Sequence, residues 1–427
     1  MATIETGLAG AELTAGDLPG AGSPVTHSQF YTTALHRSLL EIEKVDTRGI
    51  ILRAAAEASF QHLSERLGWG AMGPAARLKA VAETFREMGL GRLDLSDAGK
   101  QGGEARVTSS HLAEGWLAQY PSANRPVCVA LAGFIEGALA AVHGRRYEVR
   151  ETRCLATGSA DCHFEVNPQI GPLDYLSLPP VEYSPGPAPL DLRKGPVDGD
   201  TIAAVLFPEI SGPDSDGRIT AFGARLSRLW ADYYARVSYR VEQEIPRVMG
   251  QKFANLAAIV LTEAGHVCGY HTFGGIMLSE PWRERIAPRL VTPEERVHAL
   301  VAVVNTFGWG HWRVEALYPR ERLIVHVRDG YEAIGYRQLF GEAKDSKCFL
   351  ARGLSAAIMN LVYVGDLENR PELTPSYYNR LFRSPMSYRA VETRCQATGE
   401  PNCEVIVNPL SPNLGSLAKV LAGGRRG

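Results

Sequence analysis

The sequence predicts an α+β protein built from two copies of an antiparallel sheet domain that is covered by helices. The main observation is a motif that occurs twice: Glu-Thr-Arg-Cys-x-Ala-Thr-Gly, then a second Cys eight residues after the first, then Val-Asn-Pro. It begins at Glu151 and again at Glu392, 241 residues later. Solenoid repeats recur at roughly 20 to 50 residues, so this distance indicates a duplicated domain. The second observation is that the helical and strand patterns around the motif return in the same order.

The first copy begins with helical patterning from residue 28 to about 67, where apolar residues recur at intervals of three and four. Pro74 starts another helix, because proline fits the first helical turn, where its missing N–H is not needed. The remaining elements are expected in this order: a strand at 89–95, a turn at 98–103, helices at 112–118 and 127–141, and strands at 146–150 and 163–166.

The second copy repeats this order at a nearly constant distance. Pro293 follows Pro74 by 219 residues, and Cys348 follows Cys128 by 220. The distance grows to 241 at Cys395. The second copy is therefore expected to carry an insertion of 21 residues, around 366–385.

The duplication divides the chain into six segments, and a stretch rich in Arg, Tyr and Leu between the copies is expected to pack across both. The copies would then form an internal pseudo-dimer, since two-fold packing of like units is the commonest oligomer geometry. The expected segments are a disordered arm (1–24), the first domain (25–168), a Pro-rich linker (169–217), a helical connector (218–247), the second domain (248–409) and a C-terminal tail (410–427).

Composition excludes several classes of partner. The net charge of −2 offers no electrostatic surface for direct binding of nucleic acid or of an anionic membrane. Residues 1–23 contain no Lys or Arg, unlike the start of a secretory signal peptide. No apolar run reaches the roughly 18 residues that a membrane span requires. We expect a soluble cytoplasmic protein, whose cysteines are reduced and available to a metal.

Six of the seven cysteines fall at equivalent positions of the two copies, and a glutamate stands three residues before the middle Cys of each trio. Three thiolates and one carboxylate form a closed tetrahedral set for zinc, which accepts sulfur and oxygen ligands. The sequence therefore predicts two structural zinc ions, one per copy. The expected ligands are Cys128, Glu151, Cys154 and Cys162 in the first copy, and Cys348, Glu392, Cys395 and Cys403 in the second.

The spacing within each set makes a further structural prediction. A Glu and a Cys three residues apart point to opposite faces of a regular strand, so a bulge or strand end is expected at Glu-Thr-Arg-Cys. Gly158 and Gly399 are expected to allow an unusual backbone angle in the loop that follows. The alternative is that these cysteines are simply buried apolar residues. Arg153 and Arg394 would either offset the negative charge of the metal centres or lie on the surface.

A Cys in a helix, followed by Glu-x-x-Cys-x7-Cys before a strand, resembles the 4-vinyl reductase domain family. The resemblance covers about 25–168 and 248–409. This small-molecule-binding module occurs in a bacteriochlorophyll-biosynthesis protein and in the sensor halves of aromatic-responsive bacterial activators, where three Cys and one Glu hold a structural zinc. The resemblance implies the same fold and metal here. The activators' Walker loop and helix-turn-helix are missing from this sequence. Their phenol pocket uses a His and a Trp; His298 is near the position of that His, but no Trp matches.

The expected ligand site lies in the second copy, which carries more aromatic residues around its first strand. Trp312, Phe307 and His298 are the candidate binding residues, and the alternatives are a core tryptophan and a solvated helix histidine. The leading function is a zinc-stabilised binding or sensor protein for a small apolar or aromatic molecule, acting through a protein partner. The other hypotheses are an enzyme or enzyme accessory of a reductase or tailoring pathway, with its site in the second copy, and a structural scaffold. An enzyme needs clustered polar groups in its cavity, whereas a sensor needs mostly apolar walls.

Overall fold

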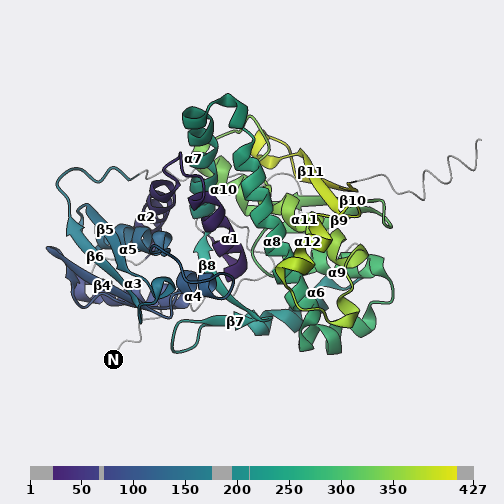
Figure 1. Cartoon of the computed structure of the whole chain (residues 1–427), viewed down its shortest axis with the longest axis horizontal. Coiled ribbons are helices and arrows are strands. Elements are labelled where there is room, and N and C mark those ends of the chain that lie inside the picture. The colour runs from purple at the N-terminus through teal and green to yellow at the C-terminus, as the bar shows by residue number, and fades with distance from the viewer. Residues whose placement is uncertain (1–22, 67–71, 176–194, 211, 411–427) are drawn as a thin grey trace, which may run out of the picture.

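The computed structural model describes residues 23–66, 72–175, 195–210 and 212–410. It confirms the α+β class: three antiparallel sheets are combined with helices. Two of the sheets carry the Cys-rich motifs, and the third lies between them (Figure 1). In the described part of the chain, no helix has the length and apolar character needed to cross a membrane.

The first motif-bearing sheet has the strand order β2-β4-β6-β5, with β3 paired to β4. Its strands are β2 (Arg92–Asp94), β3 (Ala98–Gly99), β4 (Gly102–Thr108), β5 (Tyr147–Arg153) and β6 (Cys162–Pro168). Its helices are α2 (Thr47–Arg66), α3 (Pro74–Glu87), α4 (His111–Leu117), α5 (Val129–His143) and the short η2 (Leu155–Thr157). Helix α2 packs closely on α5. Gly137 allows this approach, since a Cβ at that position would lie only 2.0 Å from the Ala56 carbonyl oxygen.

The second motif-bearing sheet has the order β11-β12-β10-β9. Each of these two sheets, taken with its helices, is called a unit below. The elements of the second unit follow one another along the chain in the same order as those of the first. Its strands are β9 (His311–Tyr318), β10 (Arg322–Arg328), β11 (Tyr388–Arg394) and β12 (Cys403–Pro409). Its helices include α8 (Leu256–Leu278), α9 (Pro293–Val304), α10 (Tyr331–Phe340), α11 (Phe349–Tyr363) and η8 (Gln396–Thr398). The extra segment of this unit forms η7 (Leu367–Asn369) and α12 (Pro375–Phe382), where the insertion was expected.

The third sheet brings together two distant parts of the chain. Strand β1 (Pro24–Ser28) pairs with β8 (Ala224–Trp230), which pairs with β7 (Ile219–Ala221). Helix α1 (Gln29–Leu40) follows β1 and contacts α4 of the first unit and α8 of the second. Helix α7 (Ala231–Met249) follows β8 and contacts α2 of the first unit and α10 of the second. Each of these helices therefore contacts both units, as Figure 1 shows.

Three sequence-based expectations are corrected here. The helix expected across 28–67 is broken at residues 41–46. The helical connector (218–247) begins as a hairpin, because Phe222 (φ 52°) and Gly223 (φ 74°) make a tight turn between β7 and β8. Residues 23 and 24 of the predicted disordered arm belong to the ordered chain, since Pro24 begins β1, while residues 1–22 lie outside the described residues.

The predicted Pro-rich linker (169–217) also contains secondary structure. It holds α6 (Gly199–Leu206) and η3 (Phe207–Ile210). The Asp198 side chain accepts hydrogen bonds from two backbone N–H groups at the start of α6, and Ile202 and Leu206 are buried. Helix α6 packs on α9. Its N-cap and its buried apolar face stabilise the helix, although the segment around it is rich in proline. Residues 176–194 of the linker and 411–427 of the tail lie outside the described residues.

Candidate metal centres and ligand site

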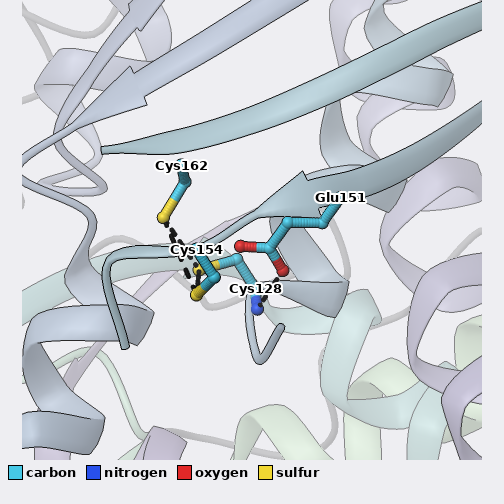
Figure 2. Close-up of side chains that lie close together, drawn as sticks. All are labelled: Cys128, Glu151, Cys154 and Cys162. Carbon is cyan, nitrogen blue, oxygen red and sulfur yellow. Dashed lines mark hydrogen bonds between the residues drawn. The ribbon is translucent and has the colours of Figure 1, made fainter. Parts of the chain in front are cut away.

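The structure brings the four residues of the first predicted metal set together (Figure 2). Cys128 lies at the N-terminal end of α5, Glu151 on β5, Cys154 just after β5, and Cys162 at the start of β6. The Sγ atom of Cys128 lies 3.9 Å from that of Cys154 and 3.6 Å from that of Cys162. The four donor atoms all lie within 4.8 Å of one another, and all four residues are buried.

The second predicted set has the same arrangement. The Sγ atom of Cys348, at the start of α11, lies 3.8 Å from that of Cys395 and 3.4 Å from that of Cys403. Glu392 completes the set from β11, and its donor atom also lies within the same 4.8 Å limit. Two buried groups of this composition, from equivalent elements, could each hold a metal ion.

The predicted bulge is present in both motifs. The register between β5 and β6 shifts between Glu151 and Arg153, and the register between β11 and β12 shifts between Glu392 and Arg394. An extra residue at this point turns the glutamate and the following cysteine toward the same side of the sheet. The glycine prediction is also confirmed, since Gly158 has φ 95° and Gly399 has φ 90°.

Each glutamate has one carboxylate oxygen that is available to a cation. Oε2 of Glu151 accepts a hydrogen bond from the Cys128 backbone N–H at 2.8 Å, and Oε2 of Glu392 accepts one from Cys348 at 3.0 Å. In both residues Oε1 is buried without a hydrogen-bond partner among the described groups. A buried carboxylate oxygen without a partner is costly, and a bound cation would remove that cost. The residues therefore fit a metal ion.

The electrostatics of the two sets lead to the same inference. Burial, and then the nearby Cys154 sulfur, raise the pKa of Glu151 to about 8. Burial and Cys395 likewise raise the pKa of Glu392 to about 9. Hydrogen bonds from the two neighbouring thiols lower the pKa of Cys154. A carboxylate and several thiolates so close together cannot all be charged unless a cation lies among them.

Backbone N–H groups also point at the sulfurs, as in many sites where thiolates bind a metal. The N–H of Leu155 donates to Cys162 Sγ at 3.4 Å, and the N–H of Gln396 donates to Cys403 Sγ at 3.2 Å. These bonds stabilise negative sulfur and fix the orientation of the ligands.

A positive charge that acts on the first set comes from Arg48, a residue that sequence reasoning missed. Arg153 is exposed, and its Nη2 lies 3.1 Å from His163 Nδ1; Arg394 is exposed as well. Arg48, on α2, is partly buried and donates from Nη2 to the Pro126 carbonyl at 3.0 Å. Burial lowers the pKa of Arg48, whereas the charges of Glu151, Cys128 and Cys154 act to raise it. Nothing in the sequence links residue 48 to a motif that begins about a hundred residues later.

The three candidate ligand-binding residues do not form one cluster. Trp312 is buried, and its indole N–H donates to the Trp309 carbonyl at 3.3 Å. Phe307 is also buried and stacks on Trp309, with ring centroids 4.9 Å apart. His298 is partly buried on α9, where its Nδ1 would lie 3.5 Å from a Cβ on Gly195, and burial lowers its pKa. Trp309 therefore connects Trp312 to Phe307, while His298 lies beside the segment that precedes α6.

An aromatic cluster around His27 was not anticipated from the sequence. The His27 ring stacks on Trp309 at 5.2 Å, and it lies 4.2 Å from the Tyr31 ring and 4.9 Å from the Tyr234 ring. His27 is fully buried, neither ring nitrogen has a hydrogen-bond partner in the described part of the chain, and burial lowers its pKa. The cluster joins β1, α7 and the second unit, so only the fold reveals it.

A groove of about 1220 Å³ lies on the first unit, between the α1–α2 loop and the α4–α5 loop. Trp116, Tyr120, Arg125 and Arg48 are among its lining residues. Since Arg48 also lies near the first metal set, the groove adjoins that centre. It is a second location where a ligand could bind.

Comparison with known proteins identifies part of the first unit. Residues 114–168 match the family model of the 4-vinyl reductase domain, and this segment contains the whole first metal set. The resemblance inferred from the Glu-x-x-Cys-x7-Cys motif is thus confirmed for this segment, while the second metal set lies outside the matched residues. A comparison with curated proteins gave no match.

Among solved structures, the chain is similar to the crystal structure of the phenol-responsive sensory domain of the transcription activator PoxR with phenol. The identity is 14%, the match covers 53% of this chain and 98% of that chain, and the TM-score is 0.37.

Proposed function

We propose that the protein is a zinc-stabilised sensor that binds a small apolar or aromatic molecule in its second unit and acts through a protein partner. The observation that supports it most directly is the buried set of three Cys and one Glu, which lies within a 4-vinyl reductase domain and has a counterpart in the second unit. We infer that the two units are copies of one domain, because their motifs and their elements follow the same order.

The metal would have a structural role. Cys128, Glu151, Cys154 and Cys162 would hold one zinc ion, and Cys348, Glu392, Cys395 and Cys403 the other. Four protein ligands complete the tetrahedral coordination of zinc, so such a centre offers no position for a substrate. Each ion would instead fix the start of a buried helix to two strands of the sheet.

The ligand would lie against the inner face of the second sheet, near Trp312 and Phe307. His298, the third residue predicted from the sequence, lies apart from this pair, beside Gly195. Both aromatic side chains are buried, as the walls of an apolar pocket are. Burial of an aromatic ring at roughly 25 cal/mol per Å² stabilises a complex by several kcal/mol before the cost of association, which is compatible with micromolar affinity.

The test is a calorimetric titration of the zinc-loaded protein with phenol, alkylphenols and tetrapyrrole precursors, accompanied by product analysis. Trp312→Ala should weaken binding roughly tenfold to a hundredfold and leave the metal content unchanged. Leu93→Ala is the matched control, because Leu93 stands at the equivalent position of the first unit. Trp116→Ala tests the groove on the first unit. Loss of affinity in Trp116→Ala but not in Trp312→Ala would move the site to that groove, and turnover of a bound compound would favour an enzyme.

A further inference from the structure

A serine hydroxyl lies beside the first metal set. The Oγ atom of Ser110 is 3.3 Å from the Sγ atom of Cys128, and both residues are 0% exposed. Ser110 is also the N-cap of α4, where its Oγ accepts a hydrogen bond from the Ala113 N–H at 3.3 Å. One hydroxyl therefore connects the start of α4 with the cysteine at the start of α5.

The second metal set has a glycine at the equivalent position. Gly330 is the N-cap of α10, as Ser110 is of α4, and each stands 18 residues before the first cysteine of its set. The residues before them, Ser109 and Asp329, have φ 56° and φ 53°, so the two turns share one backbone conformation. Because glycine has no side chain, it offers no hydroxyl to the Cys348 sulfur.

The hydrogen bonds from backbone N–H groups to sulfur are shared by the two sets. The N–H groups of Leu155 and Gln396 bond to the last cysteine of each set. The N–H groups of Val127 and Lys347, which are also equivalent, bond to the middle cysteine. In the described part of the chain, the hydroxyl of Ser110 is therefore the bond to sulfur that distinguishes the first set from the second.

A bound metal would decide the direction of the bond between Ser110 and Cys128. A hydroxyl has one hydrogen to donate and two lone pairs that accept. One lone pair receives the Ala113 N–H, so the hydrogen is available to the sulfur. A cysteine that binds a metal is a thiolate and has no hydrogen to donate. The serine is then the donor, and a hydrogen bond to a charged acceptor is among the stronger ones.

The hydroxyl would support metal binding in two ways. Three thiolates and one carboxylate carry more negative charge than a zinc ion neutralises, and a donor aimed at one sulfur stabilises the excess. The same bond holds the ligand in the orientation that binds the metal. The burial of the glutamates differs in the same direction, since Glu151 is buried and Glu392 is only partly buried.

We propose that Ser110 is a positioning residue of the first metal centre: its hydroxyl donates to the Cys128 thiolate, and this centre therefore binds zinc more tightly than the second. The inference rests on the proposed function, since it requires zinc at both sets. It adds that the two centres are unequal, so that the protein loses its zinc ions one after the other, beginning with the second unit.

The experiment exchanges the two residues in the full, zinc-loaded chain. Competition with a chromophoric chelator should remove zinc from the native chain in two steps, which Cys154→Ser and Cys395→Ser assign, because each keeps one centre. Ser110→Gly copies the second unit and should weaken the first centre roughly tenfold to a hundredfold, while the second centre stays unaltered. Glycine is well tolerated at an N-cap, so α4 itself should remain folded.

The reverse exchange and a control for the lost cap complete the set. Gly330→Ser should strengthen zinc binding by the second centre; its Cβ would lie 3.0 Å from the Val327 Cγ1, which a small shift accommodates. Thr374→Gly removes the N-cap side chain of α12 instead, and should leave both zinc affinities unchanged.

Cobalt substitution gives a readout that a change in helix stability alone does not move. In the Co²⁺-loaded protein, the sulfur-to-metal charge-transfer bands report the energy of the thiolate electrons, which rises when a hydrogen bond to sulfur is lost. The bands of the first centre should therefore move to longer wavelength in Ser110→Gly and stay in place in Thr374→Gly.

The outcomes separate this inference from the proposed function. Two bound ions, with unchanged affinities and unchanged bands in Ser110→Gly, would overturn the role of Ser110 and leave the zinc-stabilised sensor intact. A native chain that loses zinc from the first centre before the second would overturn it as well. If Ser110→Gly does not fold, an unaltered second centre in Gly330→Ser overturns the proposal. A native chain that binds no metal would contradict both the inference and the proposed function.

Discussion

Glu151 and Cys128 are joined by a hydrogen bond of 2.8 Å, in which the backbone N–H of the cysteine donates to one oxygen of the buried carboxylate. This bond orients the glutamate and leaves its second oxygen, which has no hydrogen-bond partner in the described structure, beside the thiols. Glu392 and Cys348 repeat the relationship at 3.0 Å. The glutamate is therefore held in place by the same residue that offers the first sulfur.

The purified protein should contain two zinc ions per chain. Elemental analysis after purification under reducing, zinc-containing conditions should give this stoichiometry, and Cys154→Ser and Cys395→Ser should each lose one ion. Because the ligands come together only in the folded state, the loss should also lower the melting temperature. Cys268→Ser is the control, since Cys268 is buried on α8 away from both sets. Less than one zinc per chain would contradict the assignment.

The two glutamates should contribute to metal affinity through their charge. Glu151→Gln keeps an oxygen that can accept the hydrogen bond from the Cys128 N–H, but it removes the anionic ligand. The affinity for zinc should therefore fall about tenfold to a hundredfold, the effect of losing a group that supports a metal site. Competition with a chromophoric chelator measures this change. Glu148→Gln, an exposed position on the same strand, should leave the affinity unaltered. Equal affinities in both variants would mean that the carboxylate is not a ligand.

Much of the candidate metal site could be predicted from the sequence, because three of its four residues lie in one compact motif and that motif occurs twice. The spacing of Glu151 and Cys154 was enough to predict the bulge, since strand geometry alone would separate them. Arg48 and His27 could not be predicted in the same way. Arg48 acts on Glu151, which lies about a hundred residues later in the chain. His27 stacks on Trp309, which lies 282 residues later. Only tertiary packing brings these residues together.

The third sheet shows why part of the fold was missed. Strand β1 has only five residues, and buried polar residues such as Thr26 and His27 interrupt the usual alternation of apolar and polar positions. Its partner β8 lies about two hundred residues later, and the helical pattern of α7 directly after it concealed the strand. Pairing between such distant and irregular segments leaves no periodic signal in either one.

Glu136 should make the protein less stable as the pH rises. Burial raises its pKa from 4.5 to about 7, and Tyr175 donates a hydrogen bond to it at 3.0 Å. The folded state then binds the proton more tightly than the unfolded state, so the free energy of unfolding falls between pH 4.5 and 7 and the loss is complete above pH 7. The largest expected contribution is about 3 kcal/mol.

The variant Glu136→Gln isolates this effect, because an amide still accepts the hydrogen bond from Tyr175. Urea unfolding at pH 5 and pH 8 should show a smaller decrease in stability for Glu136→Gln than for the native protein, with the variant more stable at pH 8. Glu148→Gln should behave like the native protein. An unchanged difference between the two pH values in Glu136→Gln would show that the Glu136 carboxyl is not protonated in the folded state.

The buried ion pair between Arg236 on α7 and Glu57 on α2 should contribute strongly to stability. The two side chains are 0% and 1% exposed, and their nearest charged atoms are 2.7 Å apart. Arg236→Met would leave buried carboxylates short of a partner, which typically costs about 3–5 kcal/mol. Chemical unfolding measures the loss. Arg247→Met, at the exposed end of the same helix, should cost less than about 1 kcal/mol. Similar values for the two variants would contradict a role for the buried pair.

The two units should not behave as independent domains. Helix α7 is joined to the first unit by Arg236 and to the second by Glu242, whose carboxylate accepts a hydrogen bond from Lys347 at 2.8 Å. Strand β1 similarly leaves its unit to pair with β8. A segment 25–168 expressed alone would lose both β8 and α7 and would expose the apolar surfaces that they cover.

We therefore expect 25–168 and 248–409 to be poorly soluble, or to associate when they are co-expressed with residues 218–247. Light scattering and far-UV circular dichroism on the separate and mixed segments test this. Two stable, monomeric segments that ignore one another would show that the contacts through α7 and β1 do not hold the units together.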